Sequence, residues 1–252
     1  MKILVPLKRV PDPDTKIRLK TDGSALDFDG VKFSVNPFDA IALEEALRIR
    51  DKVGNAEVVV VSVGNADSAE QLRVGLAMGA DNALLVKIDD ALDSLAIAKC
   101  LAAVYRRIQP DFVLMGKQAI DDDSNQAGQM LAALLGVGQA TFVSKLEFLD
   151  NNTKARCSRE TDAGIETVIV KLPAILTTDL RLNEPRYVSL PGIMKAKKKP
   201  LEEISTADLG VSLCSHTKIL KLELPPRRNA GVRVKSVDEL IDKLKNEAKI
   251  LS

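Results

Sequence analysis

Short apolar runs alternate with amphipathic segments over the first half of the chain. The apolar runs are rich in Val, Ile and Leu and have the length of a buried strand, whereas the segments between them repeat apolar residues at the helical spacing. Strands that alternate with helices of this length are typical of βαβ units in a parallel sheet with helices on both faces. The predicted strands are residues 2–7, 57–63, 82–86 and 111–115, and the predicted helices are residues 39–51, 66–78, 92–108 and 125–135.

Two regions depart from this alternation. Residues 10–33 contain Pro11, Pro13 and the turn sequence Asp22-Gly23-Ser24, which predict an excursion with a hairpin whose first strand is residues 16–19. Beyond Gly136 the pattern becomes that of antiparallel strands joined by polar turns, followed by one more buried strand. These later strands are expected at residues 140–149, 154–158, 166–170 and 173–178.

The chain turns polar and irregular from Asp179 onward, and it ends in a predicted amphipathic helix over residues 236–249. A long irregular stretch is usually either disordered or used to bind a partner. We therefore expect an α/β domain over residues 1–178 and an extended C-terminal arm over residues 179–252. The buried stripe of the final helix would consist of Val237, Leu240, Ile241 and Leu244.

Composition narrows the class of protein. The 252 residues suffice for a sizeable core, and a hydrophobic share of 46% argues against wholesale disorder. The net charge of +1 gives no global field, so electrostatic recognition must come from local clusters. No apolar window approaches a membrane span, and the apolar run at the N-terminus is shorter than that of a secretory signal. We expect no membrane insertion and a location in the cytoplasm, or in the mitochondrial matrix of a eukaryote.

Several kinds of catalytic chemistry lack their residues in this sequence. Cys100, Cys157 and Cys214 are scattered, without the spacing of a zinc site or a disulfide framework. His216 is the only histidine, which makes a Ser-His-Asp triad a poor prospect. Neither a P-loop nor a G-x-G-x-x-G fingerprint follows a predicted strand. We therefore expect no catalytic residues and no metal site, in a protein that holds a ligand without transforming it.

The most informative segment is residues 116–126, Gly-Lys-Gln-Ala-Ile-Asp-Asp-Asp-Ser-Asn-Gln, between a predicted strand and a predicted helix. Ligands of open parallel sheets bind beyond the carboxyl ends of the strands, where the free N–H groups of a helix N-terminus favour phosphate. Ser124, Asn125 and Gln126 can add side-chain hydrogen bonds, and Gly116 would let a ligand approach the backbone closely. The segment therefore predicts an anion or nucleotide site.

The three consecutive aspartates, Asp121 to Asp123, allow three interpretations. In the first, they cap the following helix, where its dipole favours acidic residues by about 0.3–1 kcal/mol each. In the second, they bind Mg²⁺, which usually requires a polyphosphate substrate as well. In the third, they hold the loop of a nucleotide pocket or bind sugar hydroxyls. Two other strand ends, residues 36–39 and 62–67, could face the same pocket.

A second notable stretch is the basic run at residues 195–199, which follows the apolar residues Leu190, Ile193 and Met194. Such a run is often only solvated surface. Nucleic-acid binding is a weaker alternative, because two Tyr, six Phe and no Trp leave little for base stacking. Apolar anchors beside a charged rim favour docking onto an acidic protein surface, with about 1.5–3 kcal/mol from one buried Leu and steering from the charges.

The sequence resembles the β-subunit family of electron transfer flavoproteins, in its AMP-containing form. The matching stretches run from the N-terminus to the final helix: residues 7–10, 34–38, 77–81, 116–130 and 172–199. The resemblance implies an adenine-nucleotide α-hydrolase-like fold and a heterodimer whose α subunit holds most of an FAD. That FAD accepts electrons from acyl-CoA dehydrogenases and related enzymes of fatty-acid β-oxidation and passes them to a quinone oxidoreductase. The chain is then an electron-carrier subunit and not an enzyme.

By position, the resemblance also implies the site residues. The AMP pocket would comprise Pro6, Asn36, Pro37, Phe38, Asp39, Val63, Gly116, Lys117, Gln118, Ala119, Ile120, Asp121, Asp122, Asp123, Ser124, Asn125, Gln126 and Ala127. The dehydrogenase-docking loop would comprise Leu190, Pro191, Ile193, Met194, Lys195 and Lys198. Glu160 matches an acidic residue that pairs with an α-subunit Arg. The alternative to this function is an autonomous nucleotide-binding regulator of the universal-stress type, which would not need the arm at residues 179–199.

Overall fold

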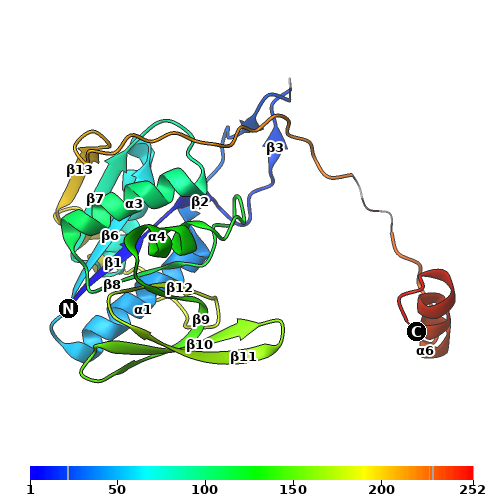
Figure 1. Cartoon of the computed structure of the whole chain (residues 1–252). Coiled ribbons are helices and arrows are strands. Elements are labelled where there is room, and N and C mark those ends of the chain that lie inside the picture. Colours follow the sequence, from blue (N-terminus) through cyan, green and yellow to red (C-terminus); the bar gives the residue numbers. More distant parts are fainter. Residues whose placement is uncertain (22, 227, 229, 252) are drawn as a thin grey trace. The chain divides into compact units, whose positions relative to one another are not determined.

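The computed structural model describes residues 1–21, 23–226, 228 and 230–251 (Figure 1). Within the described part of the chain, no helix is both long enough and apolar enough to cross a membrane. The strands are β1 (Lys2–Pro6), β2 (Arg9–Pro11), β3 (Arg18–Leu19), β4 (Leu26–Asp27), β5 (Phe33–Val35), β6 (Glu57–Gly64), β7 (Asn82–Lys87), β8 (Phe112–Gly116), β9 (Gly138–Leu149), β10 (Lys154–Thr161), β11 (Gly164–Lys171), β12 (Ala174–Thr178) and β13 (Leu201–Ser205). The helices are α1 (Pro37–Val53), η1 (Ala66–Ser68), α2 (Ala69–Met78), α3 (Ser94–Ile108), α4 (Ala127–Leu135), α5 (Leu190–Ala196), α6 (Val237–Asp242) and the π-helical turn η2 (Lys243–Glu247).

One nine-stranded sheet organises the chain, in the order β11-β10-β9-β12-β8-β1-β6-β7-β13. The strands from β9 across to β13 pair in parallel, and β10 and β11 add an antiparallel edge. Strands β1, β6 and β8 consist largely of buried apolar residues because both faces of the sheet are covered. The predicted α/β class with a mostly parallel sheet is therefore confirmed.

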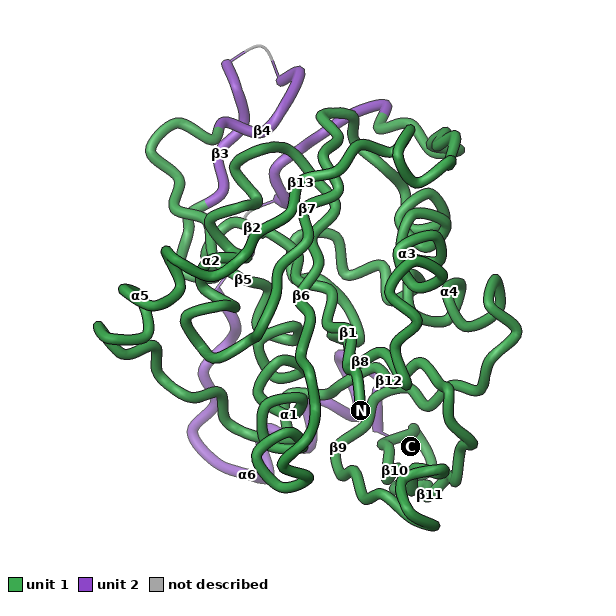
Figure 2. The backbone as a smooth tube through the Cα atoms, turned by 90° about the vertical axis from the view of Figure 1, so that its left-hand side faces the viewer, with its two compact units in different colours: residues 1–16, 28–219 green, residues 17–27, 220–252 purple. Residues whose placement is uncertain are grey.

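Helices cover both faces of this sheet (Figure 2). Helices α1 and α2 pack on one face around a core that includes Leu43, Leu47 and Leu76. Helices α3 and α4 pack on the other face, around Leu101 and Leu131. The order of elements in the first half of the chain brings the carboxyl ends of β1, β6 and β8 to the same edge of the sheet, which is where open α/β sheets bind ligands.

The chain divides into two compact units (Figure 2). The first comprises residues 1–16 and 28–219 and contains the nine-stranded sheet and the β2–β5 pair. The second comprises residues 17–27 and 220–252 and contains the β3–β4 hairpin, which confirms the predicted hairpin in the early excursion. Asp22 of the predicted turn lies outside the described residues.

Three features differ from the sequence prediction. Helix α4 begins at Ala127 and not at residue 125, because Asp123 and Asn125 have φ values of 49° and 48°, which no helix accommodates. β13 was not predicted, and it pairs with β7 beyond the expected end of the sheet. The predicted buried stripe of the final helix is wrong for the chain by itself, since Val237, Leu240 and Ile241 are 71%, 42% and 47% exposed.

Candidate functional site

A cleft of about 430 Å³ lies at the carboxyl ends of β1, β6 and β8. Its size falls within the range of about 300–1,000 Å³ typical of small-molecule sites. Its walls come from these strand ends, from residues 88–92 after β7, from the start of α3 and from the loop between β8 and α4. The lining residues are Pro6, Leu7, Lys8, Asn36, Asp39, Val61, Val63, Gly64, Ile88, Asp90, Ala91, Leu92, Ser94, Ile97, Leu101, Met115, Gly116, Lys117, Gln118, Ala119, Asp121, Asp122, Ser124, Asn125, Gln126, Ala127 and Gly128.

The structure brings most of the predicted pocket residues together in this cleft. Pro37, Phe38, Ile120 and Asp123 do not line it. Pro37 and Phe38 form the first turn of α1, and Phe38 is only 7% exposed. The sequence interpretation missed several lining residues: Lys8, the polar Asp90 and Ser94, and apolar residues of the strand ends, of the segment after β7 and of α3. The apolar ones carry no polar motif that could have marked them.

Asp39 joins the ends of two strands beneath the cleft. This side chain is buried, and its two carboxylate oxygens accept hydrogen bonds from the backbone N–H groups of Lys8 (2.8 Å) and Gly116 (3.0 Å). Burial raises the pKa of Asp39 to about 7, although both N–H groups, Asn36 and the Lys8 charge act to lower it. The carboxylate thus connects α1 to the end of β1 and to the end of β8.

This contact requires a glycine at position 116, which also lines the cleft; the approach of a ligand to its backbone stays a prediction. A Cβ at this position would lie 2.4 Å from Asp39 Oδ1 and 2.7 Å from the Cβ of Phe38. The first turn of α1 therefore packs against the backbone of residue 116, and only glycine leaves enough space there. Asn36, which is 1% exposed, extends the same junction: its Nδ2 donates to the Gln118 carbonyl (2.9 Å), and its Oδ1 accepts from the Ile120 N–H (3.3 Å).

The three aspartates hold the loop and do not cap α4. The Lys8 Nζ lies 2.8 Å from Asp121 Oδ1 and 3.1 Å from Asp122 Oδ2, and Asp123 accepts from Gln118 Nε2 (2.8 Å). Burial acts to lower the pKa of Lys8, but the two carboxylates outweigh it and raise that pKa. Among the described residues, no three His, Cys, Asp or Glu side chains gather so as to hold a metal ion. The helix-cap interpretation is therefore wrong, and these contacts favour the loop-holding one.

The start of α4 faces the cleft without a side-chain cap. Gln126 is the N-cap residue, and its side chain makes no capping hydrogen bond. Helix α4 spans nine residues, and the N–H groups of its first turn have no partner within the helix. Apolar side chains also line the cleft, among them Val61, Ile97 and Leu101. The cleft thus combines an apolar wall with a site for an anion.

The charge of Lys117 is engaged by a carboxylate and two aromatic rings. Its Nζ pairs with Asp179 Oδ2 at 2.7 Å, and it lies 5.3 Å and 4.8 Å from the ring centroids of Phe38 and Phe142. Both members of the ion pair are largely buried, with 18% and 11% of their side-chain surface exposed. The pair therefore connects the end of β8 to the chain after β12.

The predicted docking residues from Leu190 to Lys195 lie on α5, a short helix that follows an irregular segment, and Lys198 lies just after this helix. Ser189 caps it by accepting a hydrogen bond from the Gly192 N–H (3.2 Å). Leu190 is 73% exposed and Met194 is 56% exposed, whereas Ala196 is buried. Pro191, Ile193, Lys195 and Lys198 are also exposed. The helix therefore presents apolar side chains to solvent beside lysines.

Glu160 has a partner within this chain. Its carboxylate pairs with the guanidinium of Arg181, and both side chains are at least about a third exposed. The pairing of Glu160 with an arginine of another subunit stays a prediction.

The comparisons with known proteins cover the whole of this structure. The electron transfer flavoprotein domain matches residues 25–209. The chain is 57% identical over 251 residues to electron transfer flavoprotein subunit beta of Bradyrhizobium diazoefficiens, with 100% of both chains covered. It is 52% identical over 251 residues to the mitochondrial protein of that name from Arabidopsis thaliana, again with full coverage, and 47% identical over 254 residues to the one from Homo sapiens, with 99% coverage of each. Similarity of this extent over complete chains shows that this protein belongs to the β-subunit family of electron transfer flavoproteins.

Proposed function

We propose that this chain holds AMP in the cleft, completes the FAD site of an α subunit, and docks through α5 onto acyl-CoA dehydrogenases and related dehydrogenases. Electrons taken by the FAD then pass to a quinone oxidoreductase. A β subunit of an electron transfer flavoprotein implies an α-subunit partner, and the family is one of electron carriers. On this proposal, the chain acts as a scaffold for cofactors and as a docking module, and it is not an enzyme.

The observation that carries the nucleotide part is the pairing of an apolar wall with an uncapped helix start in one cleft. An adenine ring needs an apolar wall, and an uncapped helix start favours a phosphate. Of the acidic residues in the loop before α4, Asp121 and Asp122 already pair with Lys8. The cleft residues therefore fit a nucleoside monophosphate without a metal ion.

The first experiment identifies what the native protein carries. The complex is isolated under gentle conditions and denatured, and the released small molecules and the co-purifying chains are identified by mass spectrometry. We expect one second subunit with FAD and AMP in equal amounts. An excess of FAD over AMP would indicate a second flavin in the cleft, and ATP without a partner chain would favour the autonomous regulator.

The second experiment tests the cleft with a change of charge alone. Gln126→Glu is isosteric and places a carboxylate at the start of α4, where helix stability tolerates it. A carboxylate about 4–8 Å from a phosphate near a protein surface costs about 2–4 kcal/mol, so the affinity for AMP should fall by about 30-fold or more. Gln139→Glu on the exposed part of β9 adds the same charge away from the cleft and should not change AMP content. Equal AMP content in both variants would refute the site.

The docking part rests on the exposed apolar side chains of α5. Leu190→Ala removes the most exposed of them, at 73%. We expect slower electron transfer from the dehydrogenase with unchanged FAD and AMP content, because a partner that buries this leucine gains about 1.5–3 kcal/mol. Loss of FAD in this variant would instead assign Leu190 to folding or assembly.

A further inference from the structure

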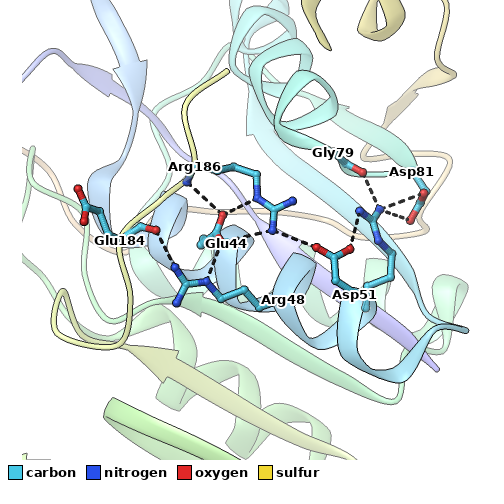
Figure 3. A network of polar contacts seen from close by, with 8 residues as sticks. Glu44, Arg48, Asp51, Gly79, Asp81, Glu184 and Arg186 are labelled. Carbon is cyan, nitrogen blue, oxygen red and sulfur yellow. Dashed lines mark hydrogen bonds and ion pairs between the residues drawn. The ribbon is translucent and has the colours of Figure 1, made fainter. Parts of the chain in front are cut away.

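A buried carboxylate fastens the chain just before α5 to helix α1 (Figure 3). The side chain of Glu44 is only 4% exposed. It accepts hydrogen bonds from Arg186 at its backbone N–H (3.1 Å) and its Nε (2.8 Å), and a further one from Arg48 Nε (2.7 Å). Burial acts to raise the pKa of Glu44, but the hydrogen bonds from Arg186 and Arg48 outweigh it and lower that pKa. Glu44 is therefore a charged group held by two arginines from different parts of the chain.

The neighbours of Arg186 strengthen the same connection. Asn183 Nδ2 donates to the Ile41 carbonyl (3.1 Å), and Arg48 Nη2 donates to the Glu184 carbonyl (3.0 Å). Arg186 Nη2 also reaches Asp51 at 3.2 Å. Figure 3 shows that the contacts of Arg186, Arg48 and Glu184 form one network along α1. The segment at residues 183–186 is thus attached to α1 at several successive points.

The chain that follows α5 is fastened as well, to helix α2. Arg73 Nη1 donates to the carbonyls of Ala196 and Lys199, both at 2.8 Å. Between the two attachments, Gly192 lies so close to α2 that a Cβ would be 2.7 Å from the Ala77 carbonyl oxygen. The exposed tip of α5 is therefore held at both ends and along its inner face, although its own side chains are largely in solvent.

We propose that Glu44 and Arg186 act as a positioning pair that orients the docking helix α5 before the dehydrogenase binds. This inference rests on the proposed docking function of α5. A loop that is ordered before binding loses less conformational entropy on association. Removing the pair should therefore weaken docking without changing the electron-transfer step inside the formed complex, the nucleotide or the flavin.

The test uses the double variant Glu44→Gln/Arg186→Met in the heterodimer, because removing both charges avoids a buried carboxylate with too few partners. The rate at which an acyl-CoA dehydrogenase reduces the flavoprotein is measured against flavoprotein concentration. We expect KM for the flavoprotein to rise about five- to tenfold, the scale of ordering one or two further side chains on binding. The value of kcat should stay within about twofold of the wild-type value. A general structural defect would be expected to lower kcat as well.

Two further variants and one structural measurement complete the design. Glu147→Gln/Arg156→Met removes an exposed ion pair of the β9–β10 hairpin (3.0 Å) and should leave KM unchanged. Arg186→Lys keeps the charge and should recover part of the affinity. Amide hydrogen exchange over residues 187–195 should accelerate in the first double variant and not in the control.

The outcomes separate this inference from the function on which it rests. An unchanged KM in the Glu44→Gln/Arg186→Met variant, with a raised KM in Leu190→Ala, would overturn the positioning role and leave the docking function intact. Failure of the double variant to assemble would also overturn it, because the pair would then be a requirement of folding. If Leu190→Ala leaves KM unchanged, the docking function of α5 fails, and unaccelerated exchange over residues 187–195 would separately overturn the positioning pair.

Discussion

Gly116→Ala tests how closely the first turn of α1 approaches the end of β8. The added Cβ would lie 2.4 Å from Asp39 Oδ1, 2.7 Å from the Cβ of Phe38 and 2.9 Å from the Asp39 backbone N. Asp39 Oδ1 is a side-chain atom, but the other two are a backbone and a Cβ atom at the start of a helix, which cannot move away without the helix itself. The helix start or the strand end must shift, which lengthens the hydrogen bond from the Gly116 N–H to Asp39.

The size of the effect follows from these two consequences. Overpacking a close-packed site costs about 1–3 kcal/mol, and weakening a buried hydrogen bond to a charged group costs up to about 1.5–3 kcal/mol. The free energy of unfolding should therefore fall by about 2 kcal/mol or more. For a chain of this size, that lowers Tm by at least about 4 °C.

The assay is thermal unfolding of the heterodimer, with release of the bound nucleotide measured in parallel. Gly138→Ala is the matched control, because its Cβ would meet only ordinary contacts, the nearest at 3.6 Å from the Lys171 carbonyl oxygen. We expect a lower Tm, and release of the nucleotide at a lower temperature, in the Gly116→Ala variant and not in the control. Equal Tm values for the two variants would refute the close approach of α1 to β8.

Three further predictions follow from the same contacts. Burial raises the pKa of Asp39 to about 7 in the folded chain, so this group's contribution to the free energy of unfolding falls by about 1.4 kcal/mol per pH unit as the pH rises from about 4 to about 7. In urea unfolding, the difference in stability between wild type and Asp39→Asn should therefore change by about 2 kcal/mol between pH 5.5 and 7. A difference that stays constant over this range would contradict the prediction. Asn36→Ala removes two hydrogen bonds that hold residues 118–120 and should cost about 1–3 kcal/mol, with faster hydrogen exchange at the Ile120 amide as its local signature. Gly192→Ala should push α5 away from the Ala77 carbonyl and raise KM for the flavoprotein with a dehydrogenase at unchanged FAD content; an unchanged KM would count against that packing.

Hydrophobic patterning predicted the central sheet because its strands are buried on both faces. Leu4, Val60 and Leu114 are fully buried, and each stands in an uninterrupted apolar run, which is the strongest sequence signal a parallel strand can give. β13 could not be recognised in this way. Its residues Leu201–Ser205 contain two adjacent glutamates, and only Ile204 is buried, so neither an apolar run nor a clean alternation marks it.

The candidate site was predictable at its polar loop and not at its supports. The motif at residues 116–126 marked the loop, but not the backbone reversals at Asp123 and Asn125, since a non-glycine residue at positive φ leaves no sure trace in a sequence. The contact of Asp39 with Gly116, 77 positions apart, depends on how α1 meets β8, and no local pattern encodes it. The same holds for Glu44 and Arg186, 142 positions apart.

β13 returns the chain to the sheet after α5, and this closes residues 179–200 into a loop with both ends in parallel strands. Removing the chain from residue 201 onward would uncover the whole edge of β7, a row of backbone donors and acceptors on a strand of mostly buried apolar residues. Such an open edge templates pairing between molecules. β13 instead presents Glu202 and Glu203 at the border of the sheet, and charged side chains on an edge strand discourage that pairing. The strand that closes the loop thus also keeps neighbouring molecules from joining edge to edge.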